Sequence, residues 1–95
     1  MEFEWDARKA AANLTKHRVS LVEAATVFGD PLAITVADPS HSFTEQRELT
    51  FGCCSDGRLL VVAHTERGGR MRLISARLAT PRERKAYEQG ADGHA

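Results

Sequence analysis

The first third of the chain carries apolar residues at helical spacing. Residues 6–17 (DARKAAANLTKH) are rich in Ala and Lys, and Asp6 can cap the first turn. Lys16 and His17 fall in the last turn, where the helix dipole favours cations. Residues 20–28 form a second predicted helix, because SLVE is a capping-box pattern and GDP ends the helix. The preceding EFEW is either a short strand or an anchor whose aromatic rings pack inward.

After residue 31 the spacing changes to that of strands. Four strands are expected, at residues 32–37, 45–54, 58–67 and 70–79, separated by a polar loop at 38–44 and by turns at SDG and Gly68-Gly69. Thr80 and Glu83 form a capping box with Pro at the first helical position, so a C-terminal helix is expected to about Gln89.

Runs of helices set apart from a run of strands predict an α+β fold. We expect N-terminal helices, a four-stranded antiparallel meander sheet and a C-terminal helix, in a single domain over residues 1–89. Residues 90–95 (GADGHA) are expected to be a disordered tail. The helices would cover one face of the sheet, and the other face would stay at least partly open to solvent or a partner.

The hairpin around Gly68-Gly69 decides which ionisable residues share a face. A two-residue turn pairs Arg67 with Arg70 and Glu66 with Met71. One face then carries the apolar residues that would meet the helices: Leu59, Val61, Ala63, Ile74, Ala76 and Leu78. The opposite, functional face mixes apolar and ionisable residues: Leu60, Val62, His64, Glu66, Leu73, Ser75 and Arg77. A three-residue turn would instead set His64 opposite Arg72, and the register stays open at this point.

Composition narrows the class of protein. The formal net charge of +0 argues against a protein that holds nucleic acid through bulk positive charge. The adjacent Cys53 and Cys54 would point to opposite faces of a strand, which suits a reducing, cytoplasmic setting. No stretch approaches the ~20 apolar residues of a membrane helix, and no signal-peptide pattern follows Met1.

Ionisable residues on the hairpin match the needs of phosphodiester chemistry. Cleaving RNA without a metal requires a base for the 2′-hydroxyl, an acid for the leaving oxygen and cations around the phosphate. His and Glu can exchange protons near neutral pH, and the planar fork of Arg binds two phosphate oxygens. The ordinary interpretation of such residues is a solvated strand face with cross-strand ion pairs. His41, Cys53, Cys54 and His64 match no structural zinc pattern, so no metal or other cofactor is predicted.

Several stretches resemble, in order and with natural spacing, the BrnT family of bacterial type II toxins. They are FEWD, KAAANLTKH, VSLVEAATVFGDP, RLLVVAHTER and RLISARLATPRERKAYE, and they run from Phe3 to Glu88. The resemblance implies a fold similar to RelE-type ribonucleases, RNA cleavage that arrests translation, and neutralisation by a cognate antitoxin. That antitoxin, BrnA, has a ribbon-helix-helix DNA-binding domain, and operator DNA would be contacted only through it. Arg18 departs from the family, which often has Gly after KH.

The resemblance also assigns roles to residues. The family's HTER corresponds to residues 64–67 and its SAR to residues 75–77. His64 would transfer protons, with Glu66 as its partner or as an alternative base, while Arg67 and Arg77 would clamp the phosphate. Further candidates for RNA contacts are Arg47, Arg72, Lys16 and Glu45.

Two functions are weighed. The first is a metal-independent endoribonuclease held inactive by a BrnA-like antitoxin, in a heterotetramer of two toxins and two antitoxins. The alternative is a non-catalytic binding module that complexes the DNA-binding antitoxin and co-represses its operon. A plain nucleic-acid-binding domain is disfavoured by the neutral net charge and the scarcity of exposed aromatic residues.

Overall fold

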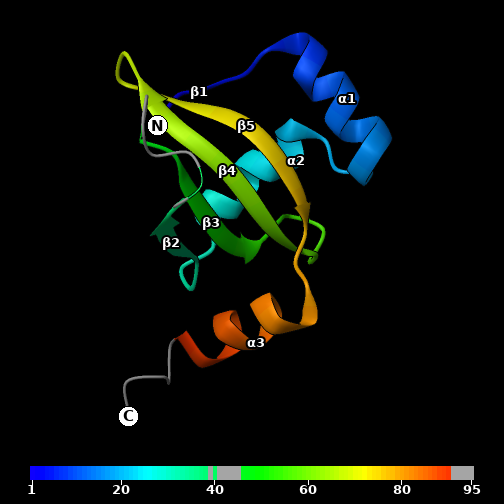
Figure 1. Ribbon diagram of the computed structural model, residues 1–95, viewed down its shortest axis with the longest axis vertical. Helices are drawn as coiled ribbons and strands as arrows, with labels where there is room; N and C mark the ends of the chain where they lie inside the picture. The colour runs from blue at the N-terminus through cyan, green and yellow to red at the C-terminus, as the bar shows by residue number, and fades with distance from the viewer. Residues whose placement is uncertain (39, 41–45, 91–95) are drawn as a thin grey trace.

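Helices lie around a five-stranded mixed sheet in the computed structural model, which describes residues 1–38, 40 and 46–90 (Figure 1). The elements in chain order are β1 (Phe3–Glu4), α1 (Ala7–His17), α2 (Leu21–Ala25), the 3₁₀ helix η1 (Thr26–Gly29), β2 (Ile34–Ala37), β3 (Glu48–Cys53), β4 (Leu59–Arg67), β5 (Arg70–Leu78) and α3 (Pro81–Gly90). The strands lie in the order β1-β5-β4-β3-β2. The predicted α+β class is confirmed.

The sheet differs from the prediction at one edge. Strands β2 to β5 form the expected antiparallel meander, but β1 pairs in parallel with β5, placing Phe3 opposite Met71 and Glu4 opposite Arg72. The expected purely antiparallel, four-stranded sheet is therefore wrong. A strand of 2 residues shows no alternation in a sequence, so the pattern could not separate a strand from an anchor. Both occur here, because Trp5 packs against the core beside the strand.

Other boundaries shift by a few residues. The second predicted helix ends as an α-helix at Ala25 and tightens into η1, and α3 extends to Gly90. Most of the predicted loop at 38–44, the start of the predicted strand 45–54 at Glu45, and the tail 91–95 lie outside the described residues.

Side-chain caps explain where the first helices begin. The Asp6 carboxylate accepts hydrogen bonds from the backbone N–H groups of Arg8 and Lys9, at 2.8 and 3.1 Å. The Ser20 hydroxyl accepts from the N–H of Glu23 at 3.0 Å, as the capping box predicts. Helix α1 ends at Arg18, which takes a left-handed conformation with φ 58° and ψ 31°. At the position where a Gly was expected, Arg18 therefore adopts the left-handed conformation that ends the helix.

A β-bulge changes which residues share a face. The two-residue turn occurs as predicted, since Arg67 lies opposite Arg70. Between Ala63 and His64 the register shifts, and Ile74 is the extra residue on β5. Beyond the bulge, Val61 therefore lies opposite Arg77. The predicted assignment of faces is wrong in two respects. The core face covered by helices carries Leu60, Val62, His64 and Leu73, which were predicted to lie on the open functional face. In addition, the inserted residue reverses the alternation and moves Ser75 and Arg77 to the opposite face from His64.

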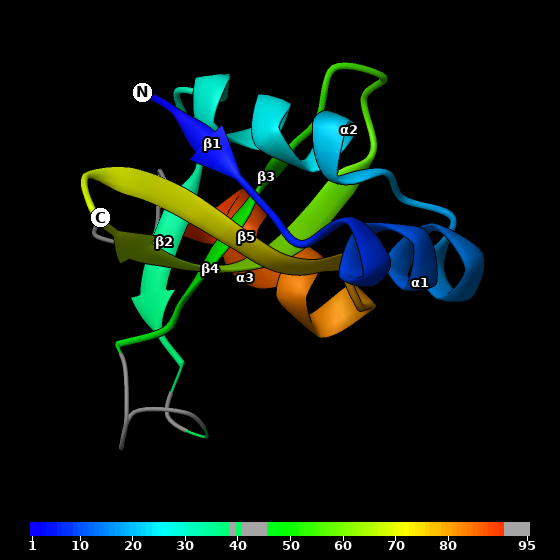
Figure 2. The same ribbon diagram turned by 90° about the horizontal axis from the view of Figure 1, so that it is seen from above.

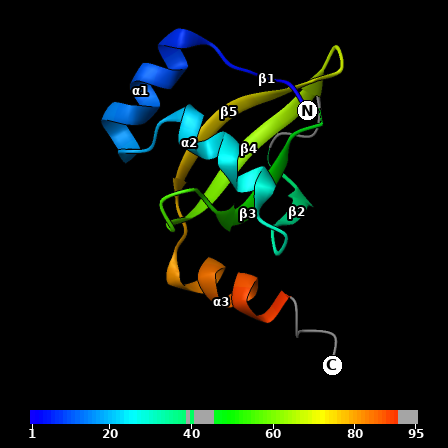
Figure 3. The same ribbon diagram turned by 180° about the vertical axis from the view of Figure 1, so that it is seen from behind.

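The first face of the sheet carries the core and is covered by α2 and η1, which cross the strands in Figure 3, while α1 lies at the side of the sheet beside β5. Its buried apolar residues are Val19, Leu21, Ala24, Val27, Cys54, Leu60, Val62, Leu73 and Ala76. Gly52 on β3 permits this close packing, since a Cβ there would lie 2.7 Å from Val27 Cγ1.

Asn13 joins α1 to the edge of β5. Its amide oxygen accepts from the N–H of Ala76 at 3.0 Å, and its amide nitrogen donates to the carbonyls of Ala76 and Val19, each at 2.9 Å. The buried side chain thus pairs a stretch of strand edge that β1 is too short to reach.

Helix α3 lies on the second face of the sheet, opposite α2 (Figure 2). It has no buried residue and is held by polar contacts. The Tyr87 hydroxyl donates to Asp30 at 2.6 Å, and Glu83 pairs with Arg77 on β5. None of the helices in the described part of the chain is long and apolar enough to span a membrane.

Candidate functional site

Arginines gather on the second face of the sheet, in the part nearest the Gly68-Gly69 turn. Alternation along β4 and β5 places Thr65 opposite Arg72 and Arg67 opposite Arg70 there, and Arg77 follows beyond the bulge. Arg47 joins them, because it immediately precedes β3 and its carbonyl accepts from the N–H of Asp38 in continuation of the β2–β3 ladder. We call this surface the arginine face; its members are Arg47, Arg67, Arg70, Arg72 and Arg77.

Carboxylates in and just before β1 form ion pairs with Arg70 and Arg72 of the arginine face. The parallel pairing puts Glu4 beside Arg72, and a guanidinium nitrogen of Arg72 donates to Glu4 Oε2 at 2.9 Å. Arg70 lies farther away, at 3.8 Å from Glu4 and 3.5 Å from Glu2. About a quarter of each side chain in the Arg72–Glu4 pair is exposed (26% and 25%), so the pair is accessible to a ligand.

A second ion pair ends the arginine face at α3. Arg77 donates two bonds to Glu83, at 2.7 and 2.8 Å, and Glu83 also accepts from the N–H of Thr80 at 2.9 Å. The bonds from Arg77 are the main reason that the pKa of Glu83 falls to about 2, and burial opposes the shift. The same contact raises the pKa of Arg77. Glu83 is therefore ionised at any physiological pH and holds Arg77 against α3.

His64 lies on the first face, away from the arginine face. Its side chain is buried, with 1% of the residue exposed, and its Nε2 is 2.6 Å from Thr50 Oγ1. The ring of Phe28 on η1 meets the imidazole edge-on, with 4.9 Å between centroids. Among the described residues Nδ1 has no hydrogen-bond partner. Burial lowers the pKa of His64, and the nearby Glu48 carboxylate opposes the shift only in part, so the ring is neutral at pH 7.

The remaining predicted residues lie in three places. Glu66 and Arg67 are exposed at the tip of the hairpin, with Glu66 on the same face as His64. Lys16 is exposed on α1, beside β5. Glu45 is outside the described residues. The structure thus brings Arg47, Arg67, Arg72 and Arg77 to one face but separates them from His64.

Sequence reasoning missed the two carboxylates that pair with the arginine face. The capping box did identify Glu83 as the residue three after Thr80, and its bond to the Thr80 N–H is present. The ion pair of Glu83 with Arg77 could not be predicted, because the face of β5 on which Arg77 lies was not known from the sequence. Glu4 is separated from Arg72 by 68 positions, and no local pattern connects them.

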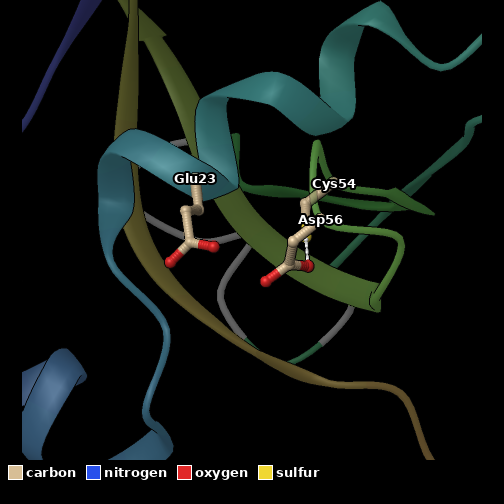
Figure 4. A group of neighbouring side chains, drawn as sticks. All are labelled: Glu23, Cys54 and Asp56. Atoms are coloured by element: carbon tan, nitrogen blue, oxygen red, sulfur yellow. Dashed lines mark hydrogen bonds between the residues drawn. The ribbon is translucent and has the colours of Figure 1, made fainter.

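One cluster offers metal-ligand atoms. Those of Glu23, Cys54 and Asp56 lie within 4.8 Å of one another, with Cys54 donating to Asp56 (Figure 4). The guanidinium of Arg58 already binds both carboxylates, at 2.9 Å to Glu23 and 2.8 Å to Asp56. The bonds from Cys54 and then Arg58 lower the pKa of Asp56 well below its usual range. Because Arg58 supplies the positive charge, we interpret the cluster as an ion-pair network that ties the β3–β4 turn to α2.

Fold and face together define a small α+β protein whose open sheet surface suits a phosphate-bearing ligand. A family model described as "Ribonuclease toxin, BrnT, of type II toxin-antitoxin system" matches residues 5–83, and the chain belongs to this family. The resemblance found in the sequence is confirmed. Membership makes the chain a ribonuclease toxin of a type II toxin–antitoxin system and implies an antitoxin partner.

A solved structure supports the fold. The 1.1 Å crystal structure of the Brucella abortus ribonuclease toxin BrnT aligns with a TM-score of 0.62 and 19% sequence identity. The alignment covers 84% of this chain and 97% of the Brucella chain. None of the curated proteins matches the chain.

Proposed function

We propose that this protein is a metal-independent endoribonuclease that arrests translation and is neutralised by a BrnA-like ribbon-helix-helix antitoxin. The family match over residues 5–83 is the observation that carries the proposal. Its finer parts are a cytoplasmic location, a likeness to RelE-type ribonucleases and a heterotetramer of two toxins and two antitoxins. Operator DNA would be contacted only through the antitoxin.

The arginine face is the proposed RNA-binding surface. Arg72 and Arg77 would each offer a planar fork to phosphate oxygens and neutralise the charge that develops during cleavage. Both guanidinium groups are now paired with carboxylates, Glu4 and Glu83, so a phosphate would compete with those carboxylates. Arg47 and Arg67 lie at the hairpin end of the same face and would contact neighbouring phosphates.

The residues predicted to transfer protons do not lie together with the arginines. His64 is buried on the opposite face of the sheet. His64 reaches RNA only if η1 moves away, since Phe28 and the strands enclose it. Glu66 is exposed at the hairpin and stays a candidate base. Glu4 is a further candidate, because it lies on the arginine face within 2.9 Å of Arg72. We therefore propose a carboxylate rather than His64 as the base. Glu4 is the first choice, because Glu66 lies on the opposite face of the sheet from the arginines.

Cleavage of RNA by the purified, antitoxin-free protein in excess EDTA tests this proposal. Arg72→Ala and Arg77→Ala should each lower the rate about 100-fold, the scale of losing a group that stabilises developing charge. Arg82→Ala removes an exposed cation of α3 and should change the rate less than about 2-fold. Glu83→Gln releases α3 while keeping Arg77, so it separates loss of the phosphate contact from loss of the helix anchor. A wild-type protein that cleaves neither free nor ribosome-bound RNA would overturn the nuclease proposal.

The binding module remains a second candidate, because each central arginine is already neutralised and the only buried histidine in the described residues is out of reach. Such a module should be harmless when it is expressed without its antitoxin. A nuclease should stop growth, and Arg77→Ala should restore it.

A further inference from the structure

A groove between α1 and the bulged part of β5 shares only Lys16 with the predicted site residues. It has a volume of about 200 Å³. Its lining residues are Lys9, Ala12, Asn13, Lys16, His17, Ile74 and Ser75.

The sequence explains why cations line this groove. Lys9 and Lys16 are seven positions apart, which is about two helical turns, so both ammonium groups project from the same side of α1. The small Ala12 lies between them and leaves room. His17 extends the same side at the C-terminal end of the helix. The result is a slot with two lysines on one wall and a strand edge on the other.

The polar atoms of Asn13, which line the groove, already have hydrogen-bond partners in the protein. All three hydrogen bonds of the Asn13 amide go to backbone groups of Ala76 and Val19. The polar groups left for a ligand are therefore the two ammonium groups, the His17 ring and the Ser75 hydroxyl. These are donors, with His17 also able to accept when neutral, and donors select an anionic ligand.

The charges of the groove are not balanced as those of the arginine face are. No lining residue is acidic, and within the described ranges no carboxylate forms an ion pair with Lys9, Lys16 or His17. Asp6 acts on Lys9 only through space, and its carboxylate is occupied by the capping bonds. Arg58, Arg72 and Arg77 by contrast each hold a carboxylate within 3 Å. Unneutralised cations beside a concave surface attract phosphate.

The groove opens onto the arginine face. Ser75 lines the groove and lies between Arg72 and Arg77 along β5. At about 3.4 Å per level of the ladder, it is roughly 7 Å from the level of Arg77 and, because Ile74 is the extra residue of the bulge, also roughly 7 Å from that of Arg72. A polyanion lying on the arginine face would therefore pass the mouth of the groove.

We propose that this groove is a phosphate subsite for the RNA backbone, outside the cleavage position. Lys9 and Lys16 bind non-bridging oxygens of one phosphate, and Ser75 and His17 donate hydrogen bonds beside them. The subsite adds affinity without reading sequence, because phosphate contacts carry no base information. The inference rests on the proposed function in naming RNA as the ligand.

A binding measurement tests the subsite independently of catalysis. The probe is a fluorescein-labelled 2′-O-methyl RNA oligonucleotide, which lacks the nucleophilic 2′-hydroxyl, and anisotropy is read at several salt concentrations. The Lys9→Gln/Lys16→Gln variant should bind at least about 10-fold more weakly than wild type. Its salt slope should fall by about 1.4, the value for two lost phosphate contacts on a single strand. The matched control, Arg84→Gln/Lys85→Gln, removes two exposed cations of α3 and should keep most of the affinity and slope.

The outcomes separate the two proposals. Equal weakening in the groove variant and the control would reduce the groove to general surface charge and overturn the subsite. Loss of antitoxin affinity without loss of RNA affinity would assign the groove to the partner and also overturn it. A wild-type protein that binds the oligonucleotide through the lysines but cleaves no RNA would sustain the subsite and overturn the nuclease.

Discussion

The two faces of the sheet use the same strands for different purposes. On the first face, alternate residues of β4 such as Leu60 and Val62 are fully buried beneath α2 and η1. On the second face, the hairpin end carries arginines and carboxylates in solvent. The end near α3 buries Leu59 and Val61 and is held by two polar anchors. Burial of apolar surface stabilises folded proteins far more than exposed ion pairs do. The first face therefore provides most of the stability, and the hairpin end of the second face is free to carry ligand-binding groups.

The bulge in β5 makes this division possible. It lets Ala76 face the core while Arg77 and Ser75 face outward, on the same side as Arg72. Without the extra residue, Ser75 and Arg77 would point into the core beside His64.

The largest loss of stability should come from truncating a buried side chain on the first face. Leu60 and Leu78 lie opposite each other on β4 and β5, but Leu60 is 0% exposed and Leu78 is 53% exposed. Leu60→Ala should lower the free energy of unfolding by about 2–5 kcal/mol, because it leaves a cavity in the core. Leu78→Ala should cost less than about 1 kcal/mol. Urea denaturation of both variants checks the pair, and equal losses would contradict the burial of Leu60 beneath α2 and η1.

A pH effect should follow from the histidine on the first face. Burial holds the pKa of folded His64 below its ordinary 6.5, so the unfolded chain binds a proton first as pH falls. Stability should be complete above about pH 6.5 and should decline below it, until the folded ring also titrates. Each unit of pKa depression contributes about 1.4 kcal/mol to that loss.

The matched variants for this prediction are His64→Gln and His17→Gln. The first should flatten the dependence of the unfolding free energy on pH between pH 7 and pH 5.5, and the second, at a half-buried position in the groove, should retain it. An unchanged slope in His64→Gln would show that His64 is accessible and would return it to the list of proton-transfer residues.

Local signals predicted much of this fold. The helix caps at Asp6 and Ser20, the two-residue turn and the four-strand meander all depend on residues close in sequence, and all were predicted. The bulge was not, because LLVV in β4 and LI in β5 are apolar at both parities and fit either register. The face on which Arg77 lies depends on that register.

The candidate site was predicted in part for the same reason. The arginines stand out in the sequence as a group, and four predicted ones share a face. His64 was misplaced relative to Arg77, since a bulge between them reverses the parity. The Glu4–Arg72 pair spans 68 positions, and it depends on the parallel pairing of β1 with β5, which no local sequence pattern predicts.

A smaller effect should come from the second face, at the anchor of α3. Glu83→Gln keeps the shape of the side chain but removes the charge that pairs with Arg77. It should cost about 1 kcal/mol, felt as a several-fold faster exchange of α3 amides, because the helix buries no side chain. Glu88→Gln on the exposed side of α3 is the control.

The pKa of Glu83 gives this anchor its own pH range. Its value of about 2 lies below the ordinary 4.5, so the pair contributes stability above pH 4.5 and loses it as pH falls toward 2. In Glu83→Gln this loss should disappear from α3 exchange rates, while the decline caused by His64 near pH 6.5 should persist. Loss of both together would show that the two faces do not unfold independently.

The smallest effect concerns the turn between α1 and α2, where Arg18 holds a positive φ of 58°. A side chain in the left-handed region is strained, and Gly is not, so Arg18→Gly should stabilise the protein by about 0.5–1 kcal/mol. The backbone contacts of the turn survive the change, since the Arg18 N–H donates to Leu14 and its carbonyl accepts from Arg58. Thermal unfolding at pH 7 measures the gain, and Arg8→Gly, inside α1, should instead destabilise by about 1 kcal/mol. Because Arg18 touches neither the core nor the arginine face, RNA binding should not change.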